Sequence, residues 1–189
     1  LLSDQSLSEF PGSEGEITFD YDPADPCPSH GAESTLATIA EAGSLLQPAP
    51  NYRPDVVSFI SEPLKEQLAI EWKIKIHLKV RTDAKDTAFS AKLCEVFQDV
   101  SAYNIRSSIT TIAADMPEGI AYTPGEKARI CVEFWDIVWT VQPGSRLRLD
   151  ISSSDFPQYA VHSNYAGIWS DQESYRPAHQ VICTGDREC

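Results

Sequence analysis

Several features that mark common classes of protein are missing from this sequence. No apolar run is long enough to cross a membrane as a helix, so we expect no membrane-spanning segment. The 28 aspartates and glutamates outnumber the 15 lysines and arginines, and the formal charge of −13 argues against nucleic acid or an anionic membrane as a partner. The first residues include neither a basic region nor a long apolar stretch, so they do not resemble a signal peptide.

Cysteine is scarce, and its spacing excludes the common zinc and redox motifs. The five cysteines are Cys27, Cys94, Cys131, Cys183 and Cys189, and none forms a C-x-x-C pair. Their odd number and the lack of an N-x-Ser/Thr sequence favour a reduced protein in the cytoplasm. A disulfide between Cys183 and Cys189 is an open alternative.

The motifs of several catalytic sites are also absent. No two of the nine glycines lie four residues apart, which excludes the G-x-S-x-G turn of a serine nucleophile, and no Gly-Lys pair exists for a phosphate-binding loop. None of the four histidines belongs to an H-E-x-x-H zinc motif. We therefore expect that this chain alone is not an enzyme and that it holds no metal or cofactor.

Alternating hydrophobicity indicates that β-strands dominate. Every second residue from Ile70 to Val80 is apolar, and this period of two predicts one long strand over residues 69–81 with a dry and a wet face. Residues 128–141 predict a second long strand, whose apolar phase changes after Phe134 and indicates a bulge or corner with one inserted residue. Shorter strands are expected at residues 17–21, 56–61, 89–97, 103–112, 147–151 and 179–183.

Helix is expected only at Ser34–Ala42, where Ser34 can cap the first turn and Gly43 follows the last. The proline-rich segments Asp22–Pro28 and Gln47–Pro54 predict long surface loops. Many strands with little helix predict an all-β, jelly-roll β-sandwich of antiparallel sheets, similar to galactose-binding domains. No linker divides the chain, so residues 1–189 are expected to form one domain.

Four short motifs, in this order along the chain, resemble a known family. They are D-P-A-D-P-C-P-S-H-G (22–31), R-P-D-V with S-E-P-L (53–56 and 61–64), D-T-A-F-S-A-K-L (86–93), and P-G-S-R-L-R-L leading into I-S-S-S-D-F-P (143–149 and 151–157). Together they resemble the C-terminal domain of X-Pro dipeptidyl-peptidases, which the CocE/NonD (cocaine esterase-like) serine hydrolases share. The resemblance extends from Leu1 to about Val181.

The resemblance implies a jelly-roll domain that packs on an α/β-hydrolase domain, where the catalytic serine, acid and histidine reside. We therefore expect the chain to be a piece of a longer hydrolase that cleaves X-Pro dipeptidyl peptides or related esters and amides. The resemblance also implies that the loop at about 29–46 approaches the acyl-binding cleft. The candidate cleft-facing or interface residues are Leu36, Ile39, Leu45, Leu46, Tyr165 and Trp169.

The end of the chain departs from the family pattern. The family usually has a further apolar strand after the Gln180–Ile182 segment, and its absence would leave an unpaired sheet edge open to self-association.

Two groups of residues allow a structural or a functional interpretation. The basic stripe of Lys73, Lys75, His77, Lys79 and Arg81 is typical of a solvated outer face or a protected edge, and docking to the hydrolase domain is the alternative. Trp135, Trp139 and Trp169 could instead stack on a sugar, which would make the chain a free-standing carbohydrate-binding module. For Trp135 and Trp139 we expect core packing.

Overall fold

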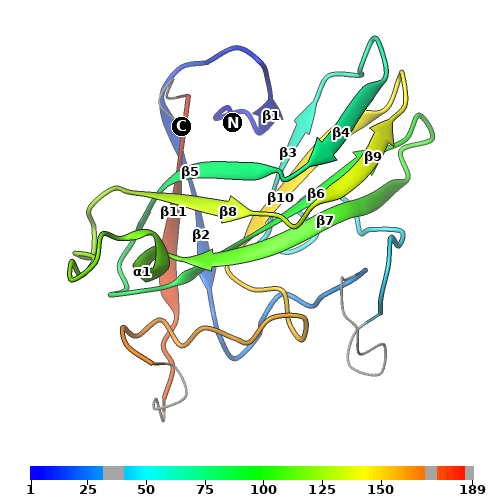
Figure 1. Cartoon of the computed structure of the whole chain (residues 1–189). Coiled ribbons are helices and arrows are strands. Elements are labelled where there is room, and N and C mark those ends of the chain that lie inside the picture. Colours follow the sequence, from blue (N-terminus) through cyan, green and yellow to red (C-terminus); the bar gives the residue numbers. More distant parts are fainter. Residues whose placement is uncertain (32–40, 169–173, 186–189) are drawn as a thin grey trace.

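The computed structural model describes residues 1–31, 41–168 and 174–185, which fold mainly into β-strands (Figure 1). All but two residues of the predicted helix at 34–42, and the candidate residues Leu36, Ile39 and Trp169, lie outside the described residues. The helix that the structure does describe is a single turn, α1 (Ile112–Asp115), whose N-cap Thr111 accepts a hydrogen bond from the backbone N–H of Ala114.

Two sheets and a two-stranded ribbon make up the fold. Sheet A has the strand order β1 (Ser6–Leu7), β3 (Val57–Ser61), β10 (Arg146–Ser152), β6 (Ala88–Val96) and β7 (Ala102–Thr111). Sheet B has the order β2 (Gly15–Tyr21), β11 (Ala178–Thr184), β5 (Lys75–Thr82) and β8 (Ala128–Glu133). The ribbon pairs β4 (Leu68–Trp72) with β9 (Ile137–Val141). All pairs except β1–β3 are antiparallel, so the predicted β-sandwich is confirmed, while the jelly-roll connectivity stays a prediction.

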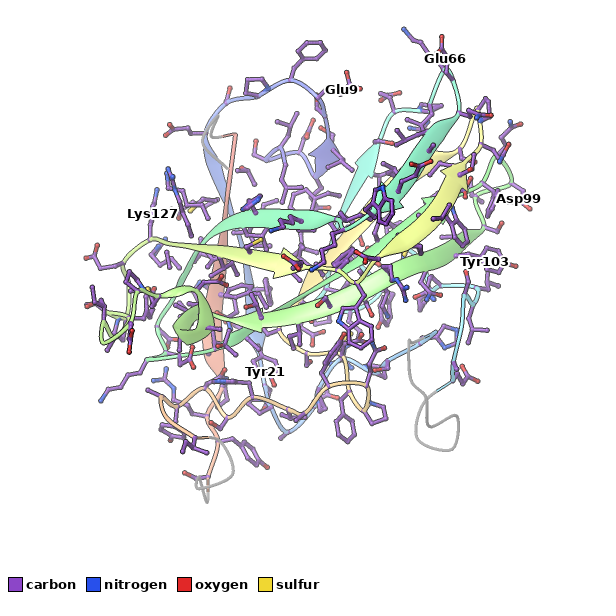
Figure 2. All side chains as sticks on the ribbon, viewed as in Figure 1. Glu9, Tyr21, Glu66, Asp99, Tyr103 and Lys127 are labelled. Carbon is purple, nitrogen blue, oxygen red and sulfur yellow. The ribbon has the colours of Figure 1, made fainter. Side chains whose placement is uncertain are left out.

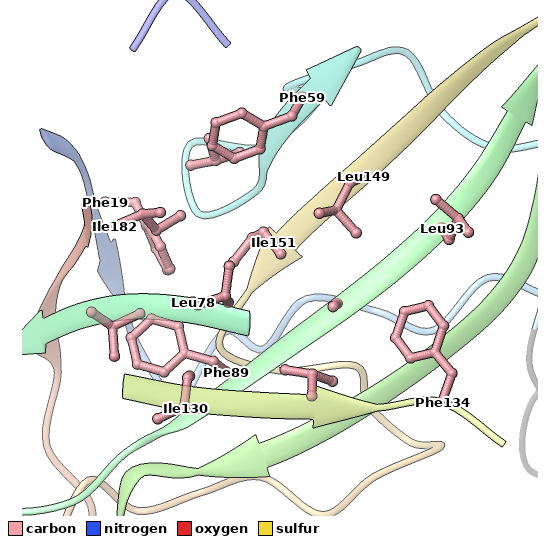
Figure 3. Close-up of a cluster of buried hydrophobic side chains, with 14 of the residues drawn as sticks. Phe19, Phe59, Leu78, Phe89, Leu93, Ile130, Phe134, Leu149, Ile151 and Ile182 are labelled. Atoms are coloured by element: carbon pink, nitrogen blue, oxygen red, sulfur yellow. The ribbon is translucent and has the colours of Figure 1, made fainter. Parts of the chain in front are cut away.

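Apolar side chains of the two sheets meet in one core (Figure 3). Phe59, Phe89 and Ile151 of sheet A are fully buried, as are Val80 and Ile182 of sheet B. The rings of Phe19 and Phe89 cross edge to face, with centroids 6.5 Å apart. Removal of this apolar surface from water is the main force that holds the layers together.

Each of the two long strands predicted from alternation is in fact a pair of strands, because the chain changes sheet midway. Trp72 at the end of β4 pairs with Ile137, and Lys75 at the start of β5 pairs with Glu133. Two residues (73–74) therefore face three (134–136) across the corner. This extra residue confirms the bulge or corner that the change of phase predicted.

A buried carboxylate joins the ribbon to sheet A. Glu95 on β6 accepts a hydrogen bond from Trp139 Nε1 at 2.9 Å and another from the backbone N–H of Gln142 at 3.0 Å. Trp139 packs against the core, as predicted. The same prediction for Trp135 is wrong, because this residue belongs to the three-residue corner, where strand alternation no longer applies, and it is 78% exposed.

The last strand in the described part of the chain, β11, lies inside sheet B. Gln180–Ile182 belongs to β11, which pairs with β2 on one side and with β5 on the other. The outer strands of sheet B are β2 and β8, and self-association through an exposed edge stays a prediction.

The basic stripe does not protect a sheet edge either, because β5 has neighbouring strands on both sides. Acidic side chains nearby balance much of its charge: Glu133 pairs with Lys73 and Lys75, and Glu16 pairs with Arg81. The stripe therefore fits the interpretation as a solvated outer face.

Candidate functional site

Three of the sequence motifs meet in the loops at one end of the sandwich, at the bottom of Figure 1. The backbone N–H of Cys27 donates to Ser154 Oγ at 2.8 Å. The backbone N–H of Phe156 donates to the Cys27 carbonyl at 2.9 Å, and that of Ser29 donates to the Phe156 carbonyl at 2.6 Å. The D-P-A-D-P loop and the S-S-S-D-F-P loop are thus joined along their backbones.

Arg53 attaches the third motif to this pair of loops. Its guanidinium donates to the buried carboxylate of Asp55 at 2.7 Å and to the backbone carbonyl of Asp25 at 2.8 Å. The hydrogen bond with Asp55 is the main reason why the pKa of Arg53 is raised above its ordinary value. The ion pair with the side chain of Asp25 adds little, because that carboxylate is exposed to water.

The loop expected to approach the cleft is fixed at its base by Asn104 on β7. The buried Asn104 amide donates to the carbonyls of Gly31 and Gly43, at 2.9 and 3.1 Å. Its Oδ1 accepts from the backbone N–H of Leu45 at 2.8 Å and from Gln47 Nε2 at 3.0 Å. One side chain therefore holds both ends of the segment from Gly31 to Gly43.

Leu45 and Leu46 follow this anchor directly. Leu45 is half-buried, whereas Leu46 is 55% exposed although it forms a β-bridge with Tyr103 on β7. The Leu46 carbonyl also lies 2.8 Å from Nε2 of His30, whose other ring nitrogen is 3.1 Å from a carboxylate oxygen of Glu41. Leu46 is thus an exposed apolar side chain on a firmly held backbone.

Tyr165 lies apart from Leu46. In Figure 1, the segment 161–168 lies at the lower left of the molecule, and the segment 41–47 lies at the right. Tyr165 adjoins Asn164, whose side chain accepts from Thr87 Oγ1 at 2.7 Å and donates to the carbonyl of Arg176. The structure therefore does not unite the described candidate residues, Leu45, Leu46 and Tyr165, in one patch.

The histidines of this end are committed to structural contacts. In His162, Nδ1 accepts a hydrogen bond from the backbone N–H of Asn164 at 3.0 Å, and Nε2 lies 3.3 Å from a carboxylate oxygen of Asp86. Both ring nitrogens are thus engaged, as they are in His30. Asp86, from the D-T-A-F-S-A-K-L motif, also accepts from the backbone N–H of Ala113.

The serines and the cysteine in the loops lack the surroundings of a nucleophile. A small cavity of about 20 Å³ lies between Cys27, Lys92 and Asp155, with Ser152 at its wall, and offers room for about one water molecule. Burial raises the pKa of the Cys27 thiol, although Tyr52 Oη lies 3.2 Å from its sulfur. A thiol kept protonated in this way is a weak nucleophile. The loops at this end of the sandwich can contribute to a binding surface. The residues around Cys27 and Ser152 do not form an activated nucleophile.

No group of three His, Cys, Asp or Glu side chains that could hold a metal ion occurs in the described part of the chain. None of its helices is long and apolar enough to span a membrane.

Sequence reasoning missed the two polar anchors, Asn104 and Glu95. Each is a polar residue within a strand of mainly apolar or small residues. Because a buried polar group needs a hydrogen-bond partner, this pattern could have indicated an anchoring role. Sequence reasoning also placed Trp72 on a dry face, whereas this side chain is 74% exposed at the corner.

Comparisons with known proteins agree with the motifs. The family model described as the X-Pro dipeptidyl-peptidase C-terminal non-catalytic domain matches residues 1–188. Cocaine esterase from Rhodococcus sp. (strain MB1 Bresler) is 30% identical over 159 residues, which are 83% of this chain and 28% of the esterase.

Solved structures show the same fold. An aminopeptidase from the marine sediment archaeon Thaumarchaeota archaeon superposes with a TM-score of 0.81 at 22% identity, over 96% of this chain and 33% of that protein. An α-amino acid ester hydrolase gives a TM-score of 0.81 at 23% identity, again over 96% of this chain and 33% of the hydrolase. The chain therefore spans a third or less of the length of these relatives.

Proposed function

The chain belongs to the family of X-Pro dipeptidyl-peptidase C-terminal non-catalytic domains, and we propose that it serves as the accessory domain of a longer serine hydrolase. The observation that carries the proposal is the match of residues 1–188 to a domain described as non-catalytic. The 28% share of the esterase that the chain covers supports it, because most of such a protein lies outside this domain.

The role we propose for the domain is to pack on the hydrolase domain and to form part of the wall of its acyl-binding cleft. The firmly held loop base supports this role, since Asn104 fixes the backbone next to the exposed Leu46. An apolar side chain held in place can exclude water from a bound acyl group without taking part in the chemistry. The reaction proposed for the longer protein is hydrolysis of X-Pro dipeptidyl peptides or of related esters and amides.

Active-site labelling tests the proposal directly. The longer protein encoded around these residues is treated with a fluorophosphonate, which labels activated serines, and is assayed with X-Pro p-nitroanilides and p-nitrophenyl esters. We expect hydrolysis and a labelled serine outside residues 1–189. A label on a serine of this chain, or the absence of both label and hydrolysis, would overturn the proposal.

A variant of Leu46 in the longer protein tests whether the domain forms part of the wall of the acyl-binding cleft. Leu46→Trp is expected to change KM for substrates with bulky acyl groups more than for those with small ones, with little effect on kcat for the small ones. Phe10→Trp is the matched control, because Phe10 is exposed and the segment before β2 lies at the top of Figure 1, opposite the loops at the bottom. Equal KM values for Leu46→Trp and Phe10→Trp across the series would contradict the wall role.

A carbohydrate-binding module is the second candidate, and the exposed indole of Trp135 is the observation that favours it. A panel of sugars tested for thermal stabilisation of the chain separates the two. A rise in Tm that Trp135→Ala abolishes would favour sugar binding, whereas no rise with any sugar would remove this candidate.

A further inference from the structure

A group of large apolar side chains is exposed where the ribbon joins sheet B. Trp72, Trp135 and Val138 are 74%, 78% and 79% exposed, and we call these three residues the tryptophan corner. A groove of about 430 Å³ is lined by Glu71, Trp72, Asp136, Ile137 and Val138, and Trp135 directly precedes Asp136 in the chain. Single exposed apolar residues are common on proteins, but several at one corner of the fold, two of them lining a groove, favour an interaction site.

The backbone at Trp72 is held in a conformation that this residue type avoids. Its φ of +69° lies in the left-handed region, which costs a bulky residue about 1–2 kcal/mol. Without that turn, alternation from Ile70, which packs against the core, would point Trp72 inward as well. The strained turn therefore places the indole in the groove at the surface instead of in the core.

The tryptophan corner is connected to the loop base along β7. Arg106 Nη2 on β7 donates to the backbone carbonyl of Asp136, the residue after Trp135, at 2.8 Å. Three residues earlier on the same strand, Tyr103 forms the β-bridge with Leu46. At about 3.3 Å per residue, these two attachment points are about 10 Å apart. The segments that carry Leu46 and Trp135 are thus both attached to β7, an outer strand of sheet A.

We propose that the tryptophan corner and Leu46 form one continuous docking face for the hydrolase domain of the longer chain. This inference rests on the proposed function and adds the surface through which the domain attaches. The size of the missing part supports this occupant, because the matched esterase and aminopeptidase have 72% and 67% of their length outside the region of this chain (100 − 28 and 100 − 33).

The charge of the face also fits an apolar partner domain. The chain has a net charge of −13, yet at the corner Lys73 and Lys75, which pair with Glu133 at 2.5 and 3.0 Å, offset two of three carboxylates, the others being Glu71 and Asp136 of the groove. A face with little net charge on an acidic protein can approach another domain without strong repulsion. Domain interfaces within a chain cover about 600–1,500 Å², and two tryptophans, a valine and a leucine provide a central apolar part for such an area.

Hydroxyl-radical footprinting of the longer protein tests the docking face. The oxidation rates of Trp72 and Trp135 are expected to be several-fold lower than the rates calculated from the intrinsic reactivity of tryptophan and from the exposure of these side chains in this structure. Phe10, which is 75% exposed, serves as the internal control and is expected to react at its full rate. In Figure 2, Glu9, the neighbour of Phe10, lies at the top of the molecule, well apart from Tyr103 at the right.

The outcomes separate this inference from the proposed function. If Trp72 and Trp135 react at full rate while another surface of residues 1–189 is protected, the docking face is wrong but the accessory role stands. If no surface is protected, both fail. If polysaccharide added to the longer protein is required to protect the two indoles, the face is a sugar site and the inference is overturned.

A pair of variants provides a second readout. Trp135→Asp is expected to lower the Tm of the longer protein by several degrees and to leave the Tm of this chain alone unchanged, because the side chain is exposed there. Phe10→Asp is the matched control and is expected to change neither Tm. Equal effects of Trp135→Asp on the longer protein and on this chain would overturn the docking face, since the indole would then act only within the sandwich.

Discussion

The Asn104 amide donates a hydrogen bond to the Gly31 carbonyl at 2.9 Å, and this contact requires glycine at position 31. A Cβ at that position would overlap Asn104 Oδ1. Gly31 also has a φ of +69°, which glycine adopts easily. The close approach lets one buried amide hold the start of the loop, while the same amide holds its end at Gly43. The shape of the loop base therefore depends on this pair.

Gly31→Ala is expected to destabilise the fold by about 3 kcal/mol, because it combines a positive φ with overlap against a side chain that is fixed by four hydrogen bonds. Gly43→Ala is the matched control: its φ is +95°, but nothing lies within 4 Å of the added Cβ, so a loss of about 1 kcal/mol is expected. Urea unfolding measures both free energies. Equal losses for the two variants would contradict the overlap.

Trp139→Phe is expected to lower the free energy of unfolding by about 1–3 kcal/mol, because it removes the indole N–H and leaves a buried oxygen of Glu95 without a donor. Trp135→Phe, which changes an exposed indole, is expected to have an effect within about 0.5 kcal/mol. Thermal unfolding of the chain measures both. A similar, small loss in both variants would mean that Glu95 does not anchor the ribbon.

The ion cluster beside the corner predicts a dependence of stability on pH. The hydrogen bonds from Lys73, and then from Lys75, lower the pKa of Glu133 from 4.5 to about 2. Because the folded pKa is the lower one, the stabilisation is complete above pH 4.5 and is lost as the pH falls towards 2. Glu133→Gln is therefore expected to lower Tm by about 1–2 °C at neutral pH and low salt, and by less as the pH falls through that window.

The control for this measurement is Glu118→Gln, which changes an exposed carboxylate in the loop before β8. We expect its Tm to follow that of the unchanged chain at every pH. If the Tm difference for Glu133→Gln stays constant down to pH 2, the carboxylate is not stabilised by the two lysines. Added salt is expected to reduce the difference at neutral pH, since exposed pairs are screened.

Thiol labelling is expected to distinguish the buried cysteines from the more accessible ones. Burial raises the pKa of Cys94 to about 12, and its side chain is fully buried in sheet A. We expect Cys94 to react with a disulfide reagent at pH 8 only at the rate of unfolding, and the half-buried Cys131 to react faster. Mass spectrometry of the labelled peptides gives both rates. Labelling of Cys94 as fast as Cys131 would show that sheet A opens locally.

The sequence was a good guide to the strands, because a period of two requires only local information. The shorter strands at 17–21, 56–61, 89–97 and 179–183 each overlap an observed strand within two residues at either end. The change of phase after Phe134 located the corner as well. It could not reveal that the chain changes its pairing partner there, because the partners at the corner, Glu133 for Lys75 and Ile137 for Trp72, are 58 and 65 positions away.

The candidate site was harder to predict, since its geometry rests on contacts between distant segments. The motifs near Cys27, Arg53 and Ser154 were recognised, and the structure joins them in one loop cluster. Asn104, which holds the loop base, belongs to no motif and acts on residues 57 to 73 positions away. Exposure at Trp135 and Trp72 follows from the corner, which strand alternation alone describes incorrectly.

The extra residue between Phe134 and Asp136 makes the length of this segment matter more than its composition. Deleting one residue there would place Ile137, Trp139 and Val141 in the same two-residue phase as Phe134, so that β8 and β9 could continue as one regular strand without the corner that exposes Trp72 and Trp135. Related chains that keep this ribbon can therefore differ in the side chains at these three positions, but not in how many positions there are.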